Sequence, residues 1–369
     1  MPNGLHRSDL PEPVRKVLAK GAVIPAHPLA LDPSRTFDRV SQRALTRYYI
    51  DAGAGGLAVG VHSTQFAIRE VGLYRPVLEL AAETAKAWTD RPLVMIAGAI
   101  GRTAQAVEEA RTARSLGYHA VLLSLAAMKG ASEDELIDHC RAVAAEMPLI
   151  GFYLQPAVGG IPLSRAFWTR FAAIDNVVAI KVAPFNRYGT LDVAFGVAAA
   201  GAEERVTLYT GNDDHIVSDL VTPFAVRTAN REVVLRFKGG LLGHWSVWAK
   251  GAVALLERLH GAVAAGPIPP EILALDGFVT DCNSVVFDVA NDFAGCIPGC
   301  HEILRRQGLM TSIHCLDPDE RLSPGQAEGI DRLYATYPEW HDDAFVAENL
   351  DRWRRRENAM TSLRVVIPL

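Results

Sequence analysis

Residues 149–182 contain an apolar strand, a helix and a second apolar strand in succession: LIGFYLQPAVGGIPLSRAFWTRFAAIDNVVAIKV. Leu149–Leu154 and Val177–Val182 are mostly apolar without polar alternation, which is typical of strands covered on both faces, as in a parallel sheet. Between them, Ser164 can cap a helix whose aromatic residues share one face. This order of elements predicts a βαβ unit.

The same pattern extends in both directions along the chain. Further strands are expected at Ala22–Pro25, Gly56–Gly60, Leu93–Gly98, Ala120–Ser124, Val206–Gly211 and, less clearly defined, between Val233 and Trp245. Strand and helix repeat about every 28–35 residues, and seven or eight such units predict an α/β fold of the (β/α)8 TIM-barrel type. An open doubly wound sheet is the competing topology, which is disfavoured because no Gly-x-Gly-x-x-Gly follows the first strand.

Two segments of different character flank the predicted barrel. We expect the barrel to occupy residues 21–265. Residues 1–20 are polar with prolines and predict an N-terminal arm. Residues 266–369 show helical patterns broken by prolines and few strand signals, which favours a C-terminal helical extension packed on the barrel.

Composition and charge narrow the functional class. Hydrophobic residues make up 49% of the 369 residues and charged residues 21%, which excludes general disorder. The formal net charge of −5 provides no basic excess for nucleic acid or an anionic membrane. Apolar runs stay under about ten residues, whereas a membrane span needs roughly 20. Because the five cysteines are scattered and no apolar signal segment is visible, we expect a cytoplasmic protein with reduced thiols.

Lys181 interrupts an apolar strand, and no carboxylate lies beside it in sequence between Val177 and Arg187. Burial without a counter-charge would lower its pKa from about 10.4 towards about 7–8, and a neutral amine can form a Schiff base with a ketone. A strand-end lysine that reaches solvent is the other interpretation. Tyr153 lies near the end of the preceding strand, where it either relays protons to such an amine or is a core tyrosine with a satisfied hydroxyl.

Several motifs occur in an order that is similar to one enzyme family. They are Gly21-Ala22-Val23-Ile24-Pro25-Ala26, Gly56-Leu57-Ala58-Val59-Gly60, Phe152-Tyr153 with Pro156 and Gly159, and Ala179-Ile180-Lys181. Over about residues 21–338 the chain resembles the dihydrodipicolinate synthase and N-acetylneuraminate lyase family, including its helical tail. This resemblance implies a (β/α)8 barrel, a homo-oligomer, and a class I aldolase mechanism on pyruvate or another 2-oxo acid without metal or cofactor. It also implies that Lys181 is the Schiff-base lysine and Tyr153 the proton relay.

The sequence departs from that family around the expected substrate pocket. After the second strand the family has Gly-Thr-Thr-Gly-Glu, where this chain reads Gly60-Val61-His62-Ser63-Thr64. The tyrosine pair after the fourth strand is absent from residues 125–129, and the arginine of the synthase branch is replaced by Val158. We therefore expect a rebuilt pocket and a reaction other than dihydrodipicolinate synthesis.

The residues predicted to bind substrate follow the second and seventh strands. We expect the oxo-acid carboxylate to be held by Gly60, His62, Ser63 and Thr64. Asn212 is expected to line the pocket, although Asn212, Asp213 and Asp214 can instead cap the following helix.

Two functional hypotheses compete with the Schiff-base lyase, whether aldolase or dehydratase. One is a barrel that binds or senses a small 2-oxo acid without turnover, which the altered loops suggest. The other is a metal-dependent barrel enzyme, with candidate ligands His27, His62, His215 and His244. Cys296, Cys300 and His301 match no common zinc spacing, so we interpret the cysteines as buried thiols and predict no metal site.

Overall fold

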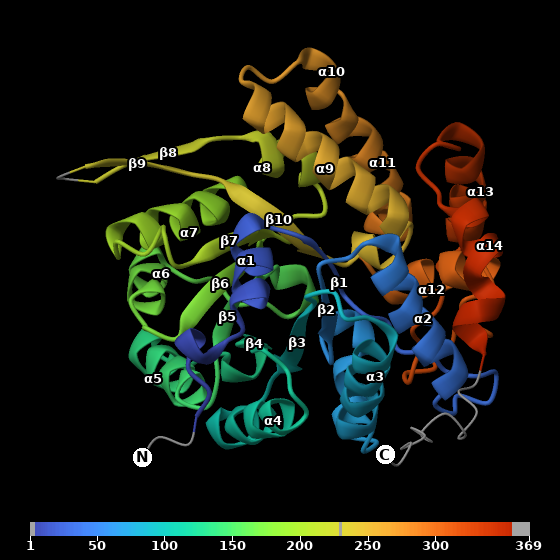
Figure 1. Ribbon diagram of the computed structural model, residues 1–369, viewed down its shortest axis with the longest axis horizontal. Helices are drawn as coiled ribbons and strands as arrows, with labels where there is room; N and C mark the ends of the chain where they lie inside the picture. Colours follow the sequence, from blue (N-terminus) through green and yellow to red (C-terminus); the bar gives the residue numbers. More distant parts are fainter. Residues whose placement is uncertain (1–3, 229–230, 356–369) are drawn as a thin grey trace, which may run out of the picture.

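The computed structural model describes residues 4–228 and 231–355, and its centre is a nearly closed barrel of eight parallel strands (Figure 1). Neighbouring strands follow the order β1-β10-β7-β6-β5-β4-β3-β2. β1 and β2 meet through a parallel bridge between Ala26 and Ala58, where the amide of His27 donates to the Ala58 carbonyl at 2.8 Å. The predicted (β/α)8 barrel is therefore confirmed.

The barrel strands begin and end close to the apolar runs of the sequence. They are β1 (Val23–Pro25), β2 (Gly56–Val59), β3 (Val94–Ala99), β4 (Ala120–Leu123), β5 (Leu149–Leu154), β6 (Val177–Ala183), β7 (Thr207–Thr210) and β10 (Phe237–Leu242). β10 is the strand that the sequence left poorly defined. Outside the barrel, β8 (Phe224–Arg227) and β9 (Glu232–Leu235) form an antiparallel hairpin that the sequence patterns did not reveal, and it projects from the body of the molecule (Figure 1).

Helices surround the barrel and continue beyond its last strand. Those up to the hairpin are α1 (Glu12–Lys20), α2 (Arg39–Ala52), α3 (Tyr74–Trp88), α4 (Thr103–Ser115), α5 (Glu133–Ala144), α6 (Arg165–Ala172), α7 (Arg187–Ala199) and α8 (Ile216–Val221). The later ones are α9 (Ala249–Ala265), α10 (Pro270–Leu273), α11 (Leu275–Val286), α12 (Cys296–Arg306), α13 (Gln326–Thr336) and α14 (Asp343–Arg354). In the described part of the chain, no helix has the length and apolar character that a membrane crossing requires.

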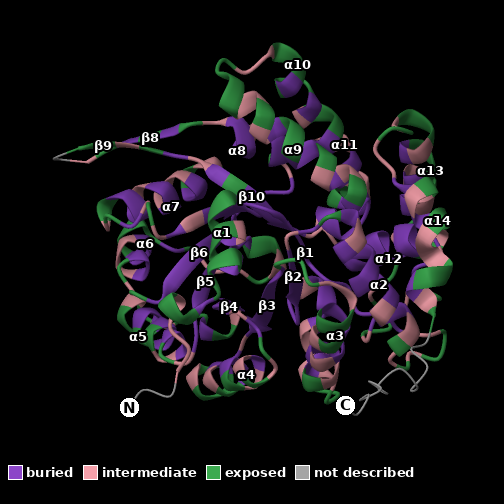
Figure 2. Ribbon diagram, viewed as in Figure 1, coloured by how far each residue is buried: buried purple, intermediate pink, exposed green. Residues whose placement is uncertain are grey.

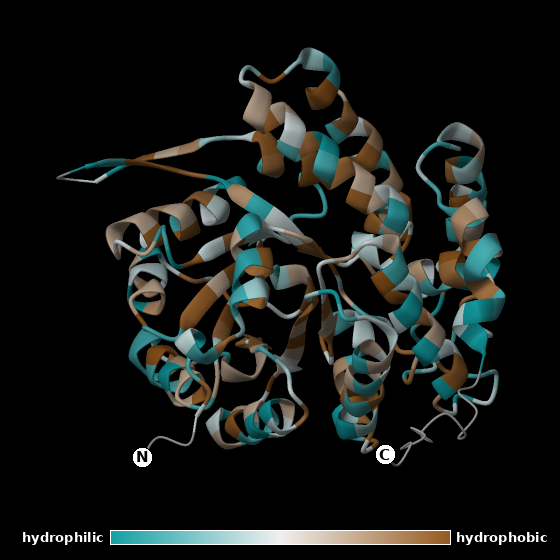
Figure 3. Cartoon of the chain, viewed as in Figure 1, coloured by the Kyte–Doolittle hydropathy of each residue, from teal (hydrophilic) through white to brown (hydrophobic). Residues whose placement is uncertain are grey.

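The apolar residues pack in two layers, one inside the barrel and one between the barrel and its helices. Figure 2 shows the barrel strands almost wholly buried, and Figure 3 shows hydrophilic residues on the outer faces of the helices. On β5, Phe152 and Leu154 belong to the inner layer, whereas Leu149 and Tyr153 belong to the outer one. Side chains alternate between the two faces of a strand, so neighbours in sequence reach different layers.

α1 closes the N-terminal end of the barrel. Its side chains Val14 and Leu18 are 6% and 5% exposed and pack with the inner layer. The hydroxyl of Tyr209 on β7 donates to the Leu18 carbonyl at 2.8 Å, which ties the helix to the strands. The segment expected to be an arm thus includes a packed helix, and the open mouth of the barrel is at the other end.

The C-terminal helices pack beside the barrel, next to α2 (Figure 1). The indole of Trp353 on α14 is fully buried, and Arg47 of α2 donates to the Trp353 carbonyl at 2.9 Å. At the start of α13, the side-chain nitrogen Nε2 of Gln326 donates to the carbonyl oxygens of Val285 and Gly295 at 3.1 and 3.0 Å. These bonds fix the end of α11 to the start of α12.

Replacing Leu18 with Ala should lower the free energy of unfolding by about 2–4 kcal/mol, because the change leaves a cavity in the inner layer. Lys16→Ala is the matched control, since Lys16 lies on the exposed side of α1 in an exposed ion pair with Glu12. The control should shift the free energy by less than about 0.5 kcal/mol. Urea unfolding followed by circular dichroism measures both, and equally small effects would show that α1 does not contribute to the core.

Candidate active site

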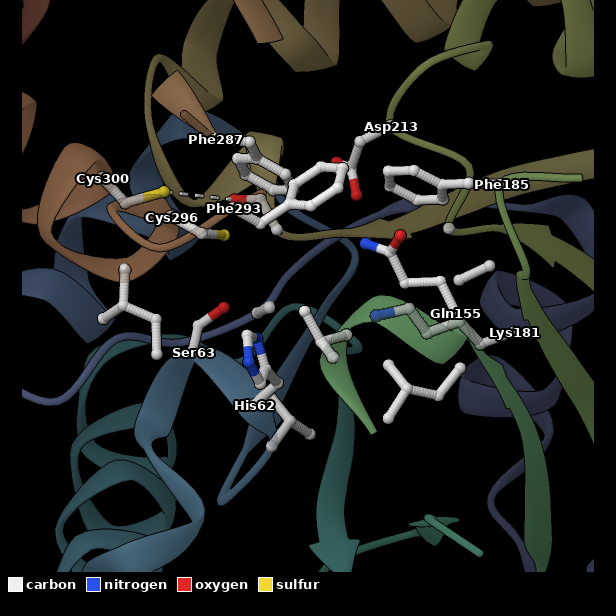
Figure 4. A pocket seen from close by; sticks show the side chains of 18 of the residues that line it. His62, Ser63, Gln155, Lys181, Phe185, Asp213, Phe287, Phe293, Cys296 and Cys300 are labelled. Carbon is white, nitrogen blue, oxygen red and sulfur yellow. Dashed lines mark hydrogen bonds between the residues drawn. The ribbon is translucent and has the colours of Figure 1, made fainter. Parts of the chain in front are cut away.

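A cavity opens at the C-terminal ends of the barrel strands, the end at which TIM barrels place their active sites (Figure 4). About 680 Å³ of space free of protein atoms lies within it, a figure that includes open solvent at the mouth. Its polar lining residues are His62, Ser63, Gln155, Lys181, Asp213 and His301. Apolar side chains and the thiols of Cys296 and Cys300 form the rest of the wall.

Lys181 points from β6 into this cavity (Figure 4). Its aliphatic stem lies against Gly211, where a Cβ would be 2.7 Å from Lys181 Cε, and its Nζ is 4.5 Å from the centre of the Phe152 ring. Burial lowers the pKa of Lys181 to about 8, while the negative charge of Asp213 acts in the opposite direction. The lowered pKa favours the neutral amine, the form that can act as a nucleophile.

Asp213 follows β7 and faces the same cavity (Figure 4). Its Oδ1 accepts a hydrogen bond from the His244 amide at 3.0 Å. Burial raises the pKa of Asp213 to about 7, although that hydrogen bond and the positive charge of Lys181 oppose the change. A carboxyl group that titrates near neutrality can accept a proton and return it during a reaction.

Asn212, by contrast, turns away from the cavity. Its side-chain nitrogen donates to Thr190 Oγ1 and Asp219 Oδ2 at 3.1 and 2.9 Å, and its Oδ1 accepts from the Phe185 amide at 3.1 Å. Asn212 therefore holds the loop that carries Phe185, and this geometry does not support its predicted contact with substrate. Asp213, one residue later, is the residue of this group that lines the cavity.

Tyr153 also lies outside the cavity. Its ring packs 5.3 Å from that of Trp168, and its hydroxyl is 3.4 Å from both the amide and the carbonyl of Leu163. β5 and β6 are neighbours as predicted, but their register pairs Phe152 with Lys181 and Tyr153 with Val182. The expectation that Tyr153 and Lys181 point into one mouth is wrong, because adjacent positions of a strand face opposite sides.

Thr64 and Gly60 shape the turn after β2 rather than the cavity wall. Thr64 Oγ1 donates to the His27 carbonyl at 2.6 Å and accepts from the amides of Gly60 and Val61 at 2.9 and 3.2 Å. Gly60 has φ 76°, and a Cβ there would lie 3.1 Å from Tyr74, so a glycine is favoured. The amides of Gly60 and Val61 are therefore already hydrogen-bonded within the turn.

His62 and Ser63, which we expected to hold the substrate carboxylate, line the cavity together with Lys181 (Figure 4). Burial lowers the pKa of His62 to about 4, and the positive charge of Lys181 adds to this effect. The imidazole is thus neutral at pH 7, with one hydrogen-bond donor and one acceptor. A neutral histidine and a serine hydroxyl can both donate to a carboxylate.

One wall of the cavity comes from the C-terminal helices and was not predicted. Phe287, Phe293, Cys296 and Cys300 face the strand ends (Figure 4), and Cys300 Sγ lies 3.9 Å from the Gly243 carbonyl. Burial raises the pKa of both thiols well above the ordinary range, so they are protonated at neutral pH. The spacing of the cysteines places them on one face of a helix, but only the tertiary structure shows that this face meets the barrel.

Two of the histidines considered as metal ligands, His27 and His215, make hydrogen bonds to other side chains. His27 Nε2 lies 2.8 Å from Thr46 Oγ1 in a buried network, and His215 Nδ1 lies 3.2 Å from Asp276 Oδ2. Across residues 4–228 and 231–355, no three or more His, Cys, Asp or Glu side chains are grouped so that they could hold a metal ion.

Comparison with known proteins relates the sequence to two kinds of enzyme. The model of the "Dihydrodipicolinate synthetase family" matches residues 19–224. A "4-hydroxy-tetrahydrodipicolinate synthase" of Moorella thermoacetica is 29% identical over 177 residues, which cover 46% of this chain and 56% of that protein. An "N-acetylneuraminate lyase 2" of Escherichia coli O6:H1 is 21% identical over 324 residues, 87% of this chain and 95% of that protein. The chain thus spans only about half of the first of these relatives.

Solved structures with the same fold belong to the same two kinds of enzyme. A dihydrodipicolinate synthase from Acinetobacter baumannii, complexed with pyruvate, superposes with a TM-score of 0.70 and 18% identity, over 88% of this chain and 99% of that one. An N-acetylneuraminate lyase from Fusobacterium nucleatum gives a TM-score of 0.68 and 17% identity, over 88% and 100%. At this level of identity, the likeness establishes the fold.

Asp213→Asn should lower the pKa of Lys181 further, because it removes the negative charge that favours the ammonium form. Competitive labelling with trace acetic anhydride over a pH series, read by peptide mass spectrometry, follows the neutral amine. Asp319→Asn, which changes an exposed carboxylate, is the control and should leave the Lys181 curve unchanged. If Asp213→Asn also leaves the curve unchanged, the two groups are not in electrostatic contact.

Proposed function

The chain belongs to the dihydrodipicolinate synthetase family, and we propose on this basis that it is a class I aldolase-type lyase in which Lys181 forms a Schiff base with pyruvate or another 2-oxo acid. The observation that carries the proposal is the buried Lys181 amine at the open mouth of the barrel, with a pKa of about 8. A lysine held in this way in a cavity is typical of a nucleophile.

The proposed first step is imine formation. The neutral amine attacks the ketone carbon, a C–N bond forms, and the former ketone oxygen takes up protons and leaves as water. The resulting iminium carries a positive charge in place of the lysine ammonium, which the nearby Asp213 carboxylate favours. The iminium then accepts the electron pair of a breaking C–C or C–H bond.

Asp213 is our candidate for the proton transfers. Its carboxyl group faces the cavity, and burial raises its pKa towards neutrality, as suits a group that accepts and returns a proton. His62 is a weaker candidate, because with a pKa of about 4 its imidazole is neutral at pH 7 and therefore cannot act as an acid there. The Tyr153 hydroxyl lies on the far side of β5.

The carboxylate of the oxo acid is proposed to bind His62 and Ser63. Both side chains line the cavity and can donate a hydrogen bond without carrying a charge. Val158 also lines the cavity, at the position where the synthase branch has an arginine. For this reason we do not propose dihydrodipicolinate synthesis; aldol cleavage, condensation and dehydration all proceed through the same imine.

The residues proposed for these steps, Lys181, Asp213, His62 and Ser63, all line one cavity of a single chain. The family resemblance led us to expect a homo-oligomer, but the tyrosine that reaches a neighbouring subunit's site is absent from residues 125–129. We propose that each site is complete within its own chain, whatever the assembly.

A second candidate function is binding or sensing of a 2-oxo acid without turnover. It is favoured by the turn after β2, where the Gly60 and Val61 amides are already bonded to Thr64 Oγ1 and are not free for a substrate carboxylate. The two functions differ in one respect that can be measured, namely a covalent bond at Lys181.

Pyruvate followed by sodium borohydride should add one reduced adduct to the chain, located at Lys181 by peptide mapping. Lys181→Met should abolish both labelling and turnover, and because it removes a buried amine it should fold at least as stably as the original protein. Lys129→Met, which removes an exposed lysine after β4, is the control and should label fully. An adduct on another lysine would contradict the proposal, and reversible binding without any adduct would support sensing.

Asp213→Asn should slow turnover by roughly 10²–10⁴, the usual effect of losing a positioned acid or base. Tyr153→Phe should retain turnover within several-fold, because its hydroxyl contacts the Leu163 backbone outside the cavity. Steady-state rates and the rate of borohydride-trappable imine measure both variants. A large loss of turnover in Tyr153→Phe, with little change in Asp213→Asn, would indicate that the tyrosine is the proton relay.

A further inference from the structure

Four phenylalanines line the cavity around the groups that carry the chemistry: Phe152, Phe185, Phe287 and Phe293. Phe185 and Phe293 come from opposite sides of the mouth, and their rings meet edge to face with centres 5.9 Å apart (Figure 4). Phe287 lies over Gly243, where a Cβ would approach its ring to 2.6 Å. Phe152 lies beside Lys181, whereas Phe185, Phe287 and Phe293 form an aromatic wall across the mouth from that lysine (Figure 4).

Two of these rings are held by unusual backbone conformations. Phe185 has φ 50° and Phe293 φ 68°, a left-handed region that bulky residues rarely adopt. The Phe185 amide donates to Asn212 Oδ1, and the Phe293 amide donates to the Asp288 carbonyl at 3.1 Å. Strained residues of this kind persist where the surrounding structure fixes them, and they cluster at ligand sites.

The loop that carries Phe293 is itself fixed by a buried carboxylate. Asp288 is 4% exposed, and its Oδ2 accepts from the Gly295 amide at 2.9 Å and from Ser323 Oγ at 2.5 Å. Asn291 donates to the other oxygen at 2.7 Å. The aromatic wall is therefore built into the fold before any ligand arrives.

Once Lys181 is engaged, the described residues that line the cavity include no positively charged side chain that could bind a second anionic group. Among its lining residues in the described chain, Lys181 is the only lysine or arginine, and imine formation engages it. Burial lowers the pKa values of His62 and His301 to about 4, so both are neutral at pH 7. A second carboxylate would lose its hydration against phenylalanine rings and protonated thiols. Gln155 and His301 are the uncharged polar side chains that remain for the rest of the substrate, against three phenylalanines.

We propose that the part of the substrate beyond the 2-oxo acid is an uncharged aromatic group, so that the protein cleaves or forms an aldol between pyruvate and an aromatic aldehyde. This inference rests on the proposed function. The carboxylate lies at His62 and Ser63, the ketone carbon is bonded to Lys181, and the aromatic ring packs against Phe185, Phe287 and Phe293. Edge-to-face contacts favour an aromatic ring over an aliphatic chain of equal size.

In the direction of cleavage, the bond between C3 and C4 breaks and its electron pair remains on C3 as the enamine of Lys181. The hydroxyl on C4 gives its proton to the Asp213 carboxylate as C4 becomes the aldehyde carbon. A proton then returns to C3, and water releases pyruvate from the imine. No oxidant or reductant is needed, and condensation is the same sequence reversed.

The test is condensation of pyruvate with benzaldehyde, D-glyceraldehyde and succinic semialdehyde, which offer an aromatic ring, hydroxyls and a carboxylate. Product formation by chromatography gives kcat/KM for each aldehyde, and benzaldehyde should exceed the other two by ~100-fold. Borohydride labelling by pyruvate alone is measured on the same samples. Labelling at Lys181 together with a preference for either polar aldehyde would overturn this inference and leave the proposed function standing. If pyruvate gives no adduct, both fail.

Variants of the aromatic wall test the same idea independently. Phe293→Ala should raise KM for benzaldehyde roughly 10- to 100-fold through lost ring contact, with pyruvate labelling retained. Phe293→Asn is a second variant, because asparagine tolerates the left-handed backbone and removes the ring with less risk to folding. Phe278→Ala on α11, an exposed phenylalanine, is the matched control and should leave KM unchanged. An unchanged benzaldehyde KM in both Phe293 variants would overturn the inference.

Discussion

A lysine amine buried inside a parallel barrel is the constraint on which the rest of the site depends. Burial disfavours the ammonium form of Lys181 and the carboxylate form of Asp213, while each charge favours the other, so both groups titrate close to neutrality. Gly211 leaves the space in which the lysine stem lies. His62 adds no competing charge because it is neutral at the same pH. The same opposition between burial and mutual charge thus makes Lys181 a candidate nucleophile and Asp213 a candidate proton carrier.

The mouth of the barrel combines two chemically different sides. The strand ends supply the polar groups, and the segment from α11 to α12 supplies aromatic rings and protonated thiols. Gln326 and Asp288 hold this second side through buried hydrogen bonds to backbone groups. α1 packs against the inner layer at the opposite end of the barrel, and the cavity that holds Lys181 opens at the mouth. The fold therefore determines both where the substrate enters and which part of it meets the amine.

The sequence predicted the barrel because apolar strands recur at regular intervals, and it drew attention to Lys181 because a charged residue interrupts one of them. The local pattern did not decide whether that lysine is buried or reaches solvent, and its proposed role came from the family resemblance. The sequence misplaced Tyr153 because side chains alternate along a strand, and a shift of one residue exchanges the inner face for the outer. Asn212 lies in the loop after β7, where its side chain bonds Thr190 and Asp219 instead of lining the cavity. β5 also has a register irregularity against β6 at Leu149, which no local pattern reveals. The wall from α12 depends on contacts between distant segments, so the apolar face of that helix could be predicted but not its partner.

A crystal structure of the protein trapped with pyruvate and borohydride tests the central claim most directly. Our account predicts continuous density from Lys181 Nζ to the former ketone carbon, with the pyruvate carboxylate against His62 and Ser63. An Asp213 oxygen should lie within hydrogen-bonding reach, about 3 Å, of the reduced nitrogen. Tyr153 should remain beside Leu163, outside the cavity. An unmodified Lys181, or a Tyr153 hydroxyl turned into the cavity in place of Asp213, would contradict the account.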